Sequence, residues 1–194
     1  MPDTPTNLLA NIGRYVTITK ELAADLAAIV RTRQLRKREF LYVPGGVCGY
    51  RNYVDRGALR SYFIDEGGKE HTVQLSIEDW FISDFYSYIT QTPGTLYVEA
   101  VEESTVLRLP YREVEGLCAR HNELSEYFRR TTERAFAFSR LRAQADISKT
   151  AEERYWEYRD RYPDIVRRMP QYAVASYLGM SPEFLSKIRA KRSG

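Results

Sequence analysis

The order of apolar and polar positions divides the chain into a helical start, a β-rich middle and a long helical remainder. Residues 17–38 have helical spacing, Thr17 or Thr19 is available as an N-cap, and basic residues close the segment. The apolar positions of this segment share one face: Leu22, Leu26, Ile29 and Val30. We therefore predict a helix over residues 17–38.

Residues 39–110 change to short alternating runs separated by turn signals. The runs are residues 39–43, 51–65, 71–76, 95–101 and 104–109. Gly67-Gly68 stands between two of them and is a good hairpin turn. Short strands at this spacing are typical of an antiparallel β-barrel or jelly roll.

From Tyr111 the spacing is helical again, and nine positions, six of them apolar, recur at alternating steps of three and four. The positions are Val114, Leu117, His121, Leu124, Phe128, Thr131, Ala135, Phe138 and Arg142. A helix of about 30 residues is about 45 Å long, which exceeds what a small barrel covers. Such a seam forms a parallel dimer or lies across its own domain. We prefer the dimer, with the helix over residues 112–144.

A further helix is expected after this seam. Ser148 is available as its N-cap, Glu152 or Glu153 lies in its first turn, and Pro163 ends it. The fold class is then α+β, with a β-barrel or jelly-roll effector domain at 1–111, the dimer helix at 112–144 and a helical domain at 145–194.

The last segment reads PQYAVASYLGMSPEFLSKIRAKRSG. Pro170 opens a helix, Gly179 ends it in a left-handed turn, and Ser181 caps a second helix that begins at Pro182. Phe184, Leu185 and Ile188 are expected to pack inward. The segment is a helix-turn-helix that reads DNA, or a helical hairpin with a solvated basic tail.

In the DNA interpretation, the second helix enters a major groove. The expected base contacts are Glu183, Ser186 and Lys187. The expected phosphate-backbone contacts are Ser181, Arg189, Lys191 and Arg192.

Charge favours that interpretation. Residues 140–194 carry twelve Lys/Arg and seven Asp/Glu, a net charge of +5, whereas the other 139 residues carry a net charge of −2. A basic end on a nearly neutral body fits a polyanion such as double-stranded DNA, although a solvated charged face has the same composition.

Composition argues against other classes. The 194 residues are 43% hydrophobic without a signal-peptide pattern or a membrane-length apolar run, so we expect a globular protein of the cytoplasm. Two cysteines and two histidines supply neither an iron–sulfur ligand set nor the metal site of a cupin enzyme, and no nucleophile or phosphate-loop motif is present. We expect no enzyme activity, no metal and no cofactor.

The residues 153–189, ERYWEYRDRYPDIVRRMPQYAVASYLGMSPEFLSKIR, resemble the C-terminal domain of Bacteroidetes-type members of the cyclic-AMP receptor/fumarate-nitrate regulator (Crp/Fnr) family. Residues 42–76 are similar to early strands of the cyclic-nucleotide-binding-like barrel of that family. The family's Glu-x-x-Ser-Arg recognition pattern stands here as Glu183, Ser186 and Lys187. The resemblance implies a bacterial, dimeric transcriptional regulator that acts with RNA polymerase.

One part of the barrel departs from the family pattern. Members that bind cyclic AMP carry Gly-Glu for the ribose and, about ten residues later, an Arg for the phosphate. Ser83-Asp84 and Gly94 stand at those places, so we expect neither cyclic AMP nor cyclic GMP to bind in the usual mode.

The same stretch is rich in aromatic residues. It either fills the barrel or lines a pocket for a small apolar ligand. The expected pocket residues are Trp80, Phe81, Asp84, Phe85, Tyr86, Thr95 and Tyr97. A signalling module that binds proteins rather than DNA is the alternative function.

Overall fold

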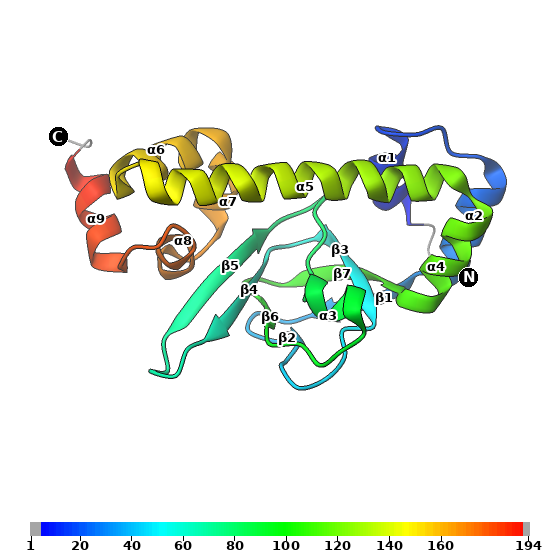
Figure 1. Ribbon diagram of the computed structural model, residues 1–194, viewed down its shortest axis with the longest axis horizontal. Coiled ribbons are helices and arrows are strands. Elements are labelled where there is room, and N and C mark those ends of the chain that lie inside the picture. The colour runs from blue at the N-terminus through cyan, green and yellow to red at the C-terminus, as the bar shows by residue number, and fades with distance from the viewer. Residues whose placement is uncertain (1–4, 192–194) are drawn as a thin grey trace.

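The computed structural model describes residues 5–191. Within them, the chain forms a β-sandwich that lies along one side of a long helix (Figure 1). The helices are α1 (Thr6–Gly13), α2 (Lys20–Ile29), α3 (Phe85–Thr90), α4 (Tyr111–Arg120), α5 (Asn122–Ser148), α6 (Ala151–Arg161), α7 (Pro163–Arg168), α8 (Gln171–Tyr177) and α9 (Pro182–Lys191). The strands are β1 (Arg31–Leu35), β2 (Phe40–Tyr42), β3 (Tyr50–Arg56), β4 (Leu59–Ile64), β5 (Glu70–Ser76), β6 (Tyr97–Ala100) and β7 (Ser104–Pro110).

The strands form two antiparallel sheets, with the orders β1-β7-β3 and β2-β6-β4-β5. Side chains alternate along each strand, so every second residue points into the space between the sheets. The buried core of that space consists of Leu35, Leu41, Val54, Leu59, Ile82, Val98, Ala100 and Val106. The α+β class and the jelly-roll type of architecture are therefore confirmed, with two open sheets in place of a closed barrel.

Each predicted β run contains one or two of these strands. At the predicted hairpin, Gly68 has a φ of 81°, and the Asp65 N–H donates to the Lys69 carbonyl at 3.0 Å. Glycine adopts this left-handed conformation without steric cost, whereas a Cβ makes it unfavourable.

The predicted helix over residues 17–38 is wrong in its second half. Thr19 caps α2 as expected, but the helix ends at Ile29, and Arg31–Leu35 is the edge strand β1 paired with β7. Val30 already has extended backbone angles. Pairing with a neighbouring strand overrides the local helical spacing here, as tertiary context often does.

The predicted continuous helix over residues 112–144 is interrupted. His121 has extended backbone angles and separates α4 from α5, while its Nε2 lies 3.0 Å from Asp25 Oδ2. Five positions of the predicted dimer seam are buried within the subunit itself, against α1, α2 and β7: Val114, Leu117, His121, Leu124 and Phe128. The first half of the seam is therefore wrong as a dimer surface.

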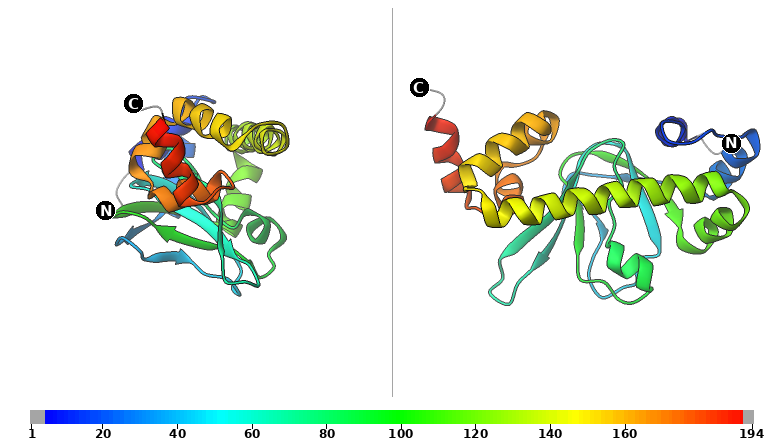
Figure 2. Two further views of the ribbon diagram at one scale, coloured as in Figure 1. Left: turned by 90° about the vertical axis from the view of Figure 1, so that its left-hand side faces the viewer. Right: turned by 45° about the horizontal axis from the view of Figure 1, so that its top comes forward.

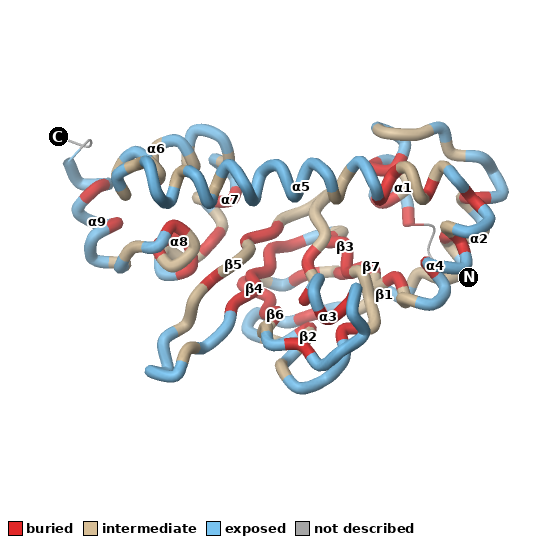
Figure 3. Tube along the Cα trace, viewed as in Figure 1, coloured by how far each residue is buried: buried red, intermediate tan, exposed pale blue. Residues whose placement is uncertain are grey.

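The second half of α5 has a different environment. Thr131 and Arg142 are half-buried, whereas Ala135 and Phe138 are exposed. Residues 133–141 are exposed at every position, and Figure 3 shows this stretch pale blue along the helix. A helix normally buries one stripe, so this stretch lacks the covering that a stable helix has within its own subunit.

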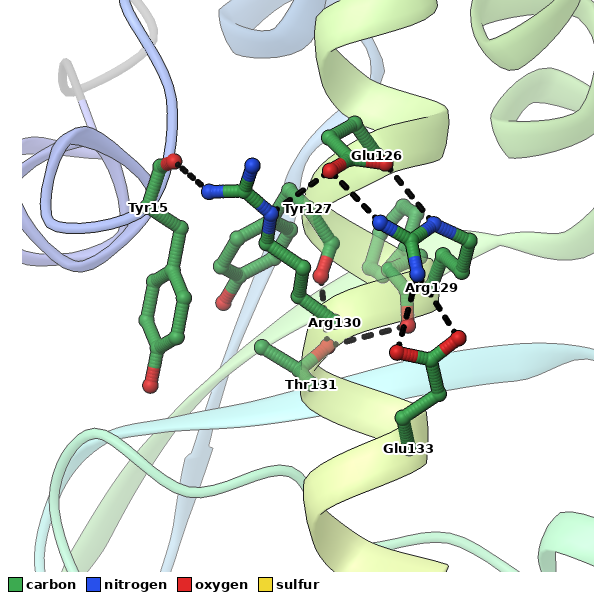
Figure 4. A network of polar contacts seen from close by, with 8 residues as sticks. Tyr15, Glu126, Tyr127, Arg129, Arg130, Thr131 and Glu133 are labelled. Atoms are coloured by element: carbon green, nitrogen blue, oxygen red, sulfur yellow. Dashed lines mark hydrogen bonds and ion pairs between the residues drawn. The ribbon is translucent and has the colours of Figure 1, made fainter.

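Polar contacts fix the N-terminal half of α5 (Figure 4). Glu126 accepts hydrogen bonds from Arg129 and Arg130, and Arg130 also donates to the Tyr15 carbonyl at 2.7 Å. Hydrogen bonds from Arg129 and Arg130 lower the pKa of Glu126 to about 2. Arg129 further pairs with Glu133 one turn on, so these charges connect the segment after α1 to the long helix.

The helix expected to start at Ser148 starts two residues later. Ser148 is the last residue of α5, and Thr150 caps α6 through a capping box with Glu153. A capping box needs a Glu or Gln three residues after the cap. Thr150 has Glu153 at that position, whereas Ser148 has Ala151, which explains why the helix starts later. Pro163 follows the end of α6, as expected, and is also the first residue of α7.

The C-terminal helices pack at one end of α5 and the N-terminal helices at the other (Figures 1 and 2). The C-terminal core is shared with the sandwich, because Ala58, Leu75 and Val101 of the β-region pack with buried residues of α6 to α9. The sandwich and the terminal helices are therefore one packed unit in this structure.

Candidate nucleic-acid interface

The segment Pro170–Lys191 forms two short helices joined by a tight turn. α8 is followed by Gly179, which has a φ of 69°, and the Ser181 hydroxyl accepts the Phe184 N–H at 3.1 Å at the start of α9. Pro182 occupies the first position of α9. The predicted helix, glycine turn and capped second helix are confirmed.

The inner face of this pair is apolar. Leu185 and Ile188 of α9 are buried with Val174 of α8, as expected. Phe184 was expected to pack inward, but its side chain is 47% exposed. The reason is geometrical, since Phe184 lies about 100° around the helix from Leu185 and leaves the contact with α8.

The outer face of α9 carries the residues predicted to contact bases. Glu183, Ser186 and Lys187 are all exposed on one helix. The Ser186 hydroxyl accepts a hydrogen bond from Gln171 Nε2 at 2.5 Å. Lys187 has no ion pair with any carboxylate among residues 5–191. Its ammonium group is thus available to a nucleic-acid partner.

The carboxyl of Glu183 stays ionised at neutral pH. Its own backbone N–H and the Ser181 hydroxyl lower the pKa of this carboxyl. A carboxylate at the start of a helix is also favoured by the helix dipole. Such an oxygen can accept from the exocyclic amine of cytosine.

The residues predicted to contact the phosphate backbone occupy the two ends of α9. Ser181 is engaged as the helix cap, and Arg189 and Lys191 are exposed near the C-terminal end. Lys191 lies 3.5 Å from Glu152 of α6. Arg192 lies outside the described residues.

The first helix of the pair is fastened to the sandwich. The Ser176 hydroxyl accepts the Thr72 N–H at 2.9 Å and donates to the Glu70 carbonyl at 3.1 Å, so α8 takes backbone groups of β5 as its partners. Arg142 of α5 donates both to the Val73 carbonyl and to the Tyr177 carbonyl, at 2.9 and 2.7 Å. These contacts hold α5, α8 and β5 together.

Two arginines strengthen this junction. Arg168 of α7 donates to Glu78 at 2.5 and 2.9 Å and also pairs with Glu102. Arg60 of β4 is buried, and its guanidinium lies 4.9 Å from the centre of the Tyr172 ring of α8. The position of α9 is therefore set by contacts with the sandwich as well as by α5.

Sequence reasoning did not identify this junction. Ser176 lies 104 residues from its partner Thr72, and no local pattern marks a serine that bonds a distant strand. Arg142 stood in the predicted seam but has a contact to β5 instead. The one available signal was its charge within a mostly apolar seam.

The stretch around Ser83-Asp84 and Gly94 stands where the family members that bind cyclic AMP have their ribose and phosphate contacts. In this structure, its polar groups bond to the backbone of the same stretch. Asp84 is buried, and its carboxylate accepts from the Ser87 N–H at 3.1 Å, the Thr95 N–H at 2.8 Å and the Leu96 N–H at 3.0 Å. A Cβ on Gly94 would lie 2.5 Å from Asp84 Oδ2. No side chain fits at position 94 without moving this structure.

The seven residues of the predicted apolar pocket lie in different surroundings. Trp80 packs on Tyr162 in the C-terminal core, and Phe81 packs in the N-terminal core. The remaining members divide between the buried cap Asp84, the half-buried Tyr97, and the exposed residues Phe85, Tyr86 and Thr95. The structure does not gather them around one cavity.

Two open surface depressions of about 300 Å³ each lie elsewhere. One is beside β2, lined by Phe40, Leu41, Tyr42, Val43 and Gly46. The other lies between the C-terminal half of α5 and helices α6 and α8, where Phe138, Tyr158 and Tyr177 are among its lining residues. In residues 5–191, no cluster of three or more His, Cys, Asp or Glu side chains is placed to hold a metal ion. None of the described helices has the length and apolarity needed to cross a membrane.

No protein-family model and no curated protein matches the sequence. Solved structures do match. The chain is similar to FixK2 from Bradyrhizobium japonicum, with a TM-score of 0.73, 18% identity and 84% of each chain covered. It is similar to a CooA variant from Carboxydothermus hydrogenoformans, with a TM-score of 0.72, 16% identity, and 95% and 83% of the two chains covered.

A third similar structure is that of the c-di-GMP-responsive global regulator CLP of Xanthomonas campestris. The TM-score is 0.69 at 13% identity, with 90% of this chain and 92% of CLP covered. These neighbours are Crp/Fnr family regulators. The chain therefore has the fold of Crp/Fnr regulators across its sandwich, long helix and C-terminal helices.

Proposed function

We propose that this protein is a DNA-binding transcriptional regulator of the Crp/Fnr type. The observation that carries the proposal is the outer face of α9, where Glu183, Ser186 and Lys187 are exposed on the second helix of a helix-turn-helix. The similar folds of FixK2 and CLP support it, since CLP is described as a global regulator that links cell–cell signalling to virulence gene expression. A bacterial cytoplasm is the matching location, RNA polymerase the expected partner, and the Bacteroidetes-type assignment stays a prediction.

The direct test is selection of bound fragments from a genomic library, followed by titration of one selected duplex at 50 and 200 mM salt. Specific binding with a steep loss of affinity at the higher salt concentration is expected, because phosphate contacts release counterions. Absence of binding at 50 mM salt would favour a module that binds proteins.

Lys187→Ala should weaken binding to the selected duplex by about tenfold, the loss of one specific contact from a recognition helix. Fluorescence anisotropy with a labelled duplex measures the effect. Lys20→Ala is the matched control, because Lys20 is an exposed lysine at the start of α2, and this variant should keep the wild-type Kd. Unchanged affinity in Lys187→Ala would remove this residue from the interface.

We further propose that the regulator is a dimer through the second half of α5. The support is the exposed stretch 133–141 together with two large apolar side chains, Phe136 at 65% and Ile147 at 90% exposure. They are eleven residues, or three helical turns, apart and so share one face. A second copy placed in parallel would cover that face.

Ile147→Asp should convert the dimer into a monomer, because the charge would lie within the covered face. Sedimentation velocity at micromolar concentration measures the change in mass. Ser139→Asp is the control, since Ser139 is exposed on the same helix but lies about 80° around it from Ile147. A wild-type protein that sediments as a monomer would contradict the dimer.

We propose that the sandwich does not use a cyclic nucleotide as its effector. The support is the carboxylate of Asp84, which is saturated by three backbone N–H groups, and the lack of room for a side chain at Gly94. A buried phosphate without a cation is strongly unfavourable. Calorimetric titration with cyclic AMP and cyclic GMP up to 1 mM should show no saturation, and a micromolar Kd with one site per chain would overturn the proposal.

A further inference from the structure

The side-chain amide of Gln171, the first residue of α8, reaches across to α9. Its Nε2 donates to the Pro182 carbonyl at 2.9 Å and to the Ser186 hydroxyl at 2.5 Å. A carbonyl oxygen can only accept, so the atom that faces Pro182 must be the nitrogen of the amide and not its oxygen. Both N–H groups of the Gln171 side chain are therefore used by α9.

Neighbouring residues hold Gln171 in this place. Ala173 and Val174 of α8 are buried in the C-terminal core, and the ring of Tyr172 lies against the buried guanidinium of Arg60 in β4. Gln171 itself is half-buried. Its side chain thus extends from a fixed backbone, which lowers the entropy cost of keeping both hydrogen bonds.

These two bonds change what the Ser186 hydroxyl can do. A serine inside a helix can donate its hydroxyl to the carbonyl four residues earlier, which for Ser186 is the carbonyl of Pro182. That carbonyl has two lone pairs. One accepts the backbone N–H of Ser186 in the regular helical pattern, and the other accepts from Gln171. The hydroxyl hydrogen of Ser186 therefore loses its usual acceptor.

The same hydrogen has no other acceptor in the described part of the chain. Among residues 5–191, the one hydrogen bond of the Ser186 hydroxyl is the bond that it accepts from Gln171. A hydroxyl that accepts a hydrogen bond becomes a stronger donor, because linked hydrogen bonds polarise one another. Ser186 is exposed on the outer face of α9, together with Glu183 and Lys187. Its O–H group is thus available to a partner on that face.

We propose that Gln171 is a positioning residue that sets DNA specificity, because it fixes Ser186 as a hydrogen-bond donor to one base. This inference rests on the proposed function. In the major groove, guanine presents N7 and O6 as acceptors, adenine presents N7 and thymine presents O4, whereas the polar group of cytosine is a donor. The base that faces Ser186 is then guanine, adenine or thymine, and cytosine is disfavoured there.

The test measures Kd by fluorescence anisotropy for the duplex selected from the genomic library and for duplexes in which cytosine replaces each base of one half-site in turn. The wild type should bind about fivefold more weakly when cytosine faces Ser186, the value of one neutral hydrogen bond. Ser186→Ala identifies the position, since this cytosine penalty should fall below twofold in that variant while the penalties at other positions remain.

Gln171→Met should lose the cytosine penalty at the same position, because the Pro182 carbonyl is then free to accept the Ser186 hydroxyl. The double variant Gln171→Met/Ser186→Ala should lose no more than either single variant, as expected for two residues that act through one contact. Thermal unfolding without DNA checks that each variant is folded.

Gln171→Glu is a second variant of nearly equal size. Its carboxylate would accept the Ser186 hydroxyl, so the cytosine penalty should vanish here too, while the added negative charge weakens binding to all duplexes alike. Gln34→Met, at an exposed glutamine of the edge strand β1, is the matched control and should keep the wild-type penalties.

The inference is overturned if the cytosine penalty persists in Gln171→Met and Gln171→Glu, whether or not binding to every duplex weakens equally. That result would show a structural contact between α8 and α9 without a role in base selection. Multiplied losses in the double variant, or a Ser186→Ala variant with unchanged penalties, would also overturn it. A wild type that binds no duplex at 50 mM salt contradicts the proposed function and this inference together, so the two failures are distinguishable.

Discussion

Arg60→Met should lower the free energy of unfolding by about 3–5 kcal/mol, the loss expected when one partner of a buried ion pair is removed. The side chain of Arg60 is 4% exposed, and that of its partner Glu99 is 10% exposed. Arg60 donates to Glu99 Oε2 from Nε at 3.0 Å and from an Nη at 2.7 Å, and to Glu70 at 2.7 Å. Without the guanidinium, the Glu99 carboxylate is buried without a cation.

The double variant Arg60→Met/Glu99→Met distinguishes two quantities. One is the cost of burying the Glu99 carboxylate without a cation, and the other is the net contribution of the Arg60–Glu99 ion pair to stability. Replacing both partners of a buried pair by apolar groups of similar volume is often neutral, so the double variant should recover most of the loss. Urea unfolding followed by circular dichroism measures all three proteins. Arg56→Met, exposed at the end of β3, is the control and should stay within about 0.5 kcal/mol of the wild type.

A loss below 1 kcal/mol in Arg60→Met would show that water reaches Glu99 and screens it. The wild-type contact also has a consequence for the helix-turn-helix, because the Tyr172 ring of α8 lies against the same guanidinium. The variant is therefore expected to loosen α8 as well, seen as faster amide hydrogen exchange in Gln171–Tyr177.

The strands were predictable because alternation and glycine turns are local properties of the sequence. The hairpin at Gly67-Gly68 and the capped start of α9 at Ser181 are set within a few residues, and both appear in the structure as expected. The helix expected to continue to residue 38 failed for the opposite reason. Arg31–Leu35 becomes a strand through its partner β7, whose paired residues are 69 to 77 positions away in the chain.

Periodicity shows that a face is apolar, but it does not show what covers the face. The seam from Leu117 to Phe128 meets helices of its own subunit, while Phe136 and Ile147 remain exposed on a face that the seam did not include. The outer residues of α9 were predictable from local sequence. Its start is marked by the cap at Ser181, and the apolar positions Leu185 and Ile188 mark its inner face, which leaves the other positions outside.

Arg168→Met should lower the free energy of unfolding by about 2 kcal/mol at pH 7. Arg168 is the one side chain of α7 that donates to two carboxylates of the sandwich, Glu78 and Glu102, as far as residues 5–191 show. Hydrogen bonds to charged groups are worth about 1.5–3 kcal/mol. The carboxylates are each over a third exposed, so solvent screening keeps the expected loss below that of a fully buried pair.

The effect should depend on pH in a defined direction. Burial raises the pKa of Glu78, but hydrogen bonds from Arg168 and the Gly57 N–H outweigh burial and lower the pKa from its ordinary value of 4.5 to about 2. A carboxyl with a lowered pKa stabilises the folded state fully above its unfolded pKa, and this contribution is lost as the pH falls through the folded pKa. The difference between wild type and Arg168→Met should therefore be largest above pH 5 and shrink between pH 4.5 and 2.

Arg167→Met is the matched control at the neighbouring position. Arg167 is exposed and pairs only with Asp164 of its own helix within the described chain, so its removal should cost less than about 0.5 kcal/mol at every pH. Urea unfolding between pH 2.5 and 7 measures both variants. If Arg168→Met matched Arg167→Met in size and in pH profile, the contact between α7 and the sandwich would not contribute to stability. The expected difference would instead show that Arg168 holds α7, and with it the C-terminal helices, against the sandwich.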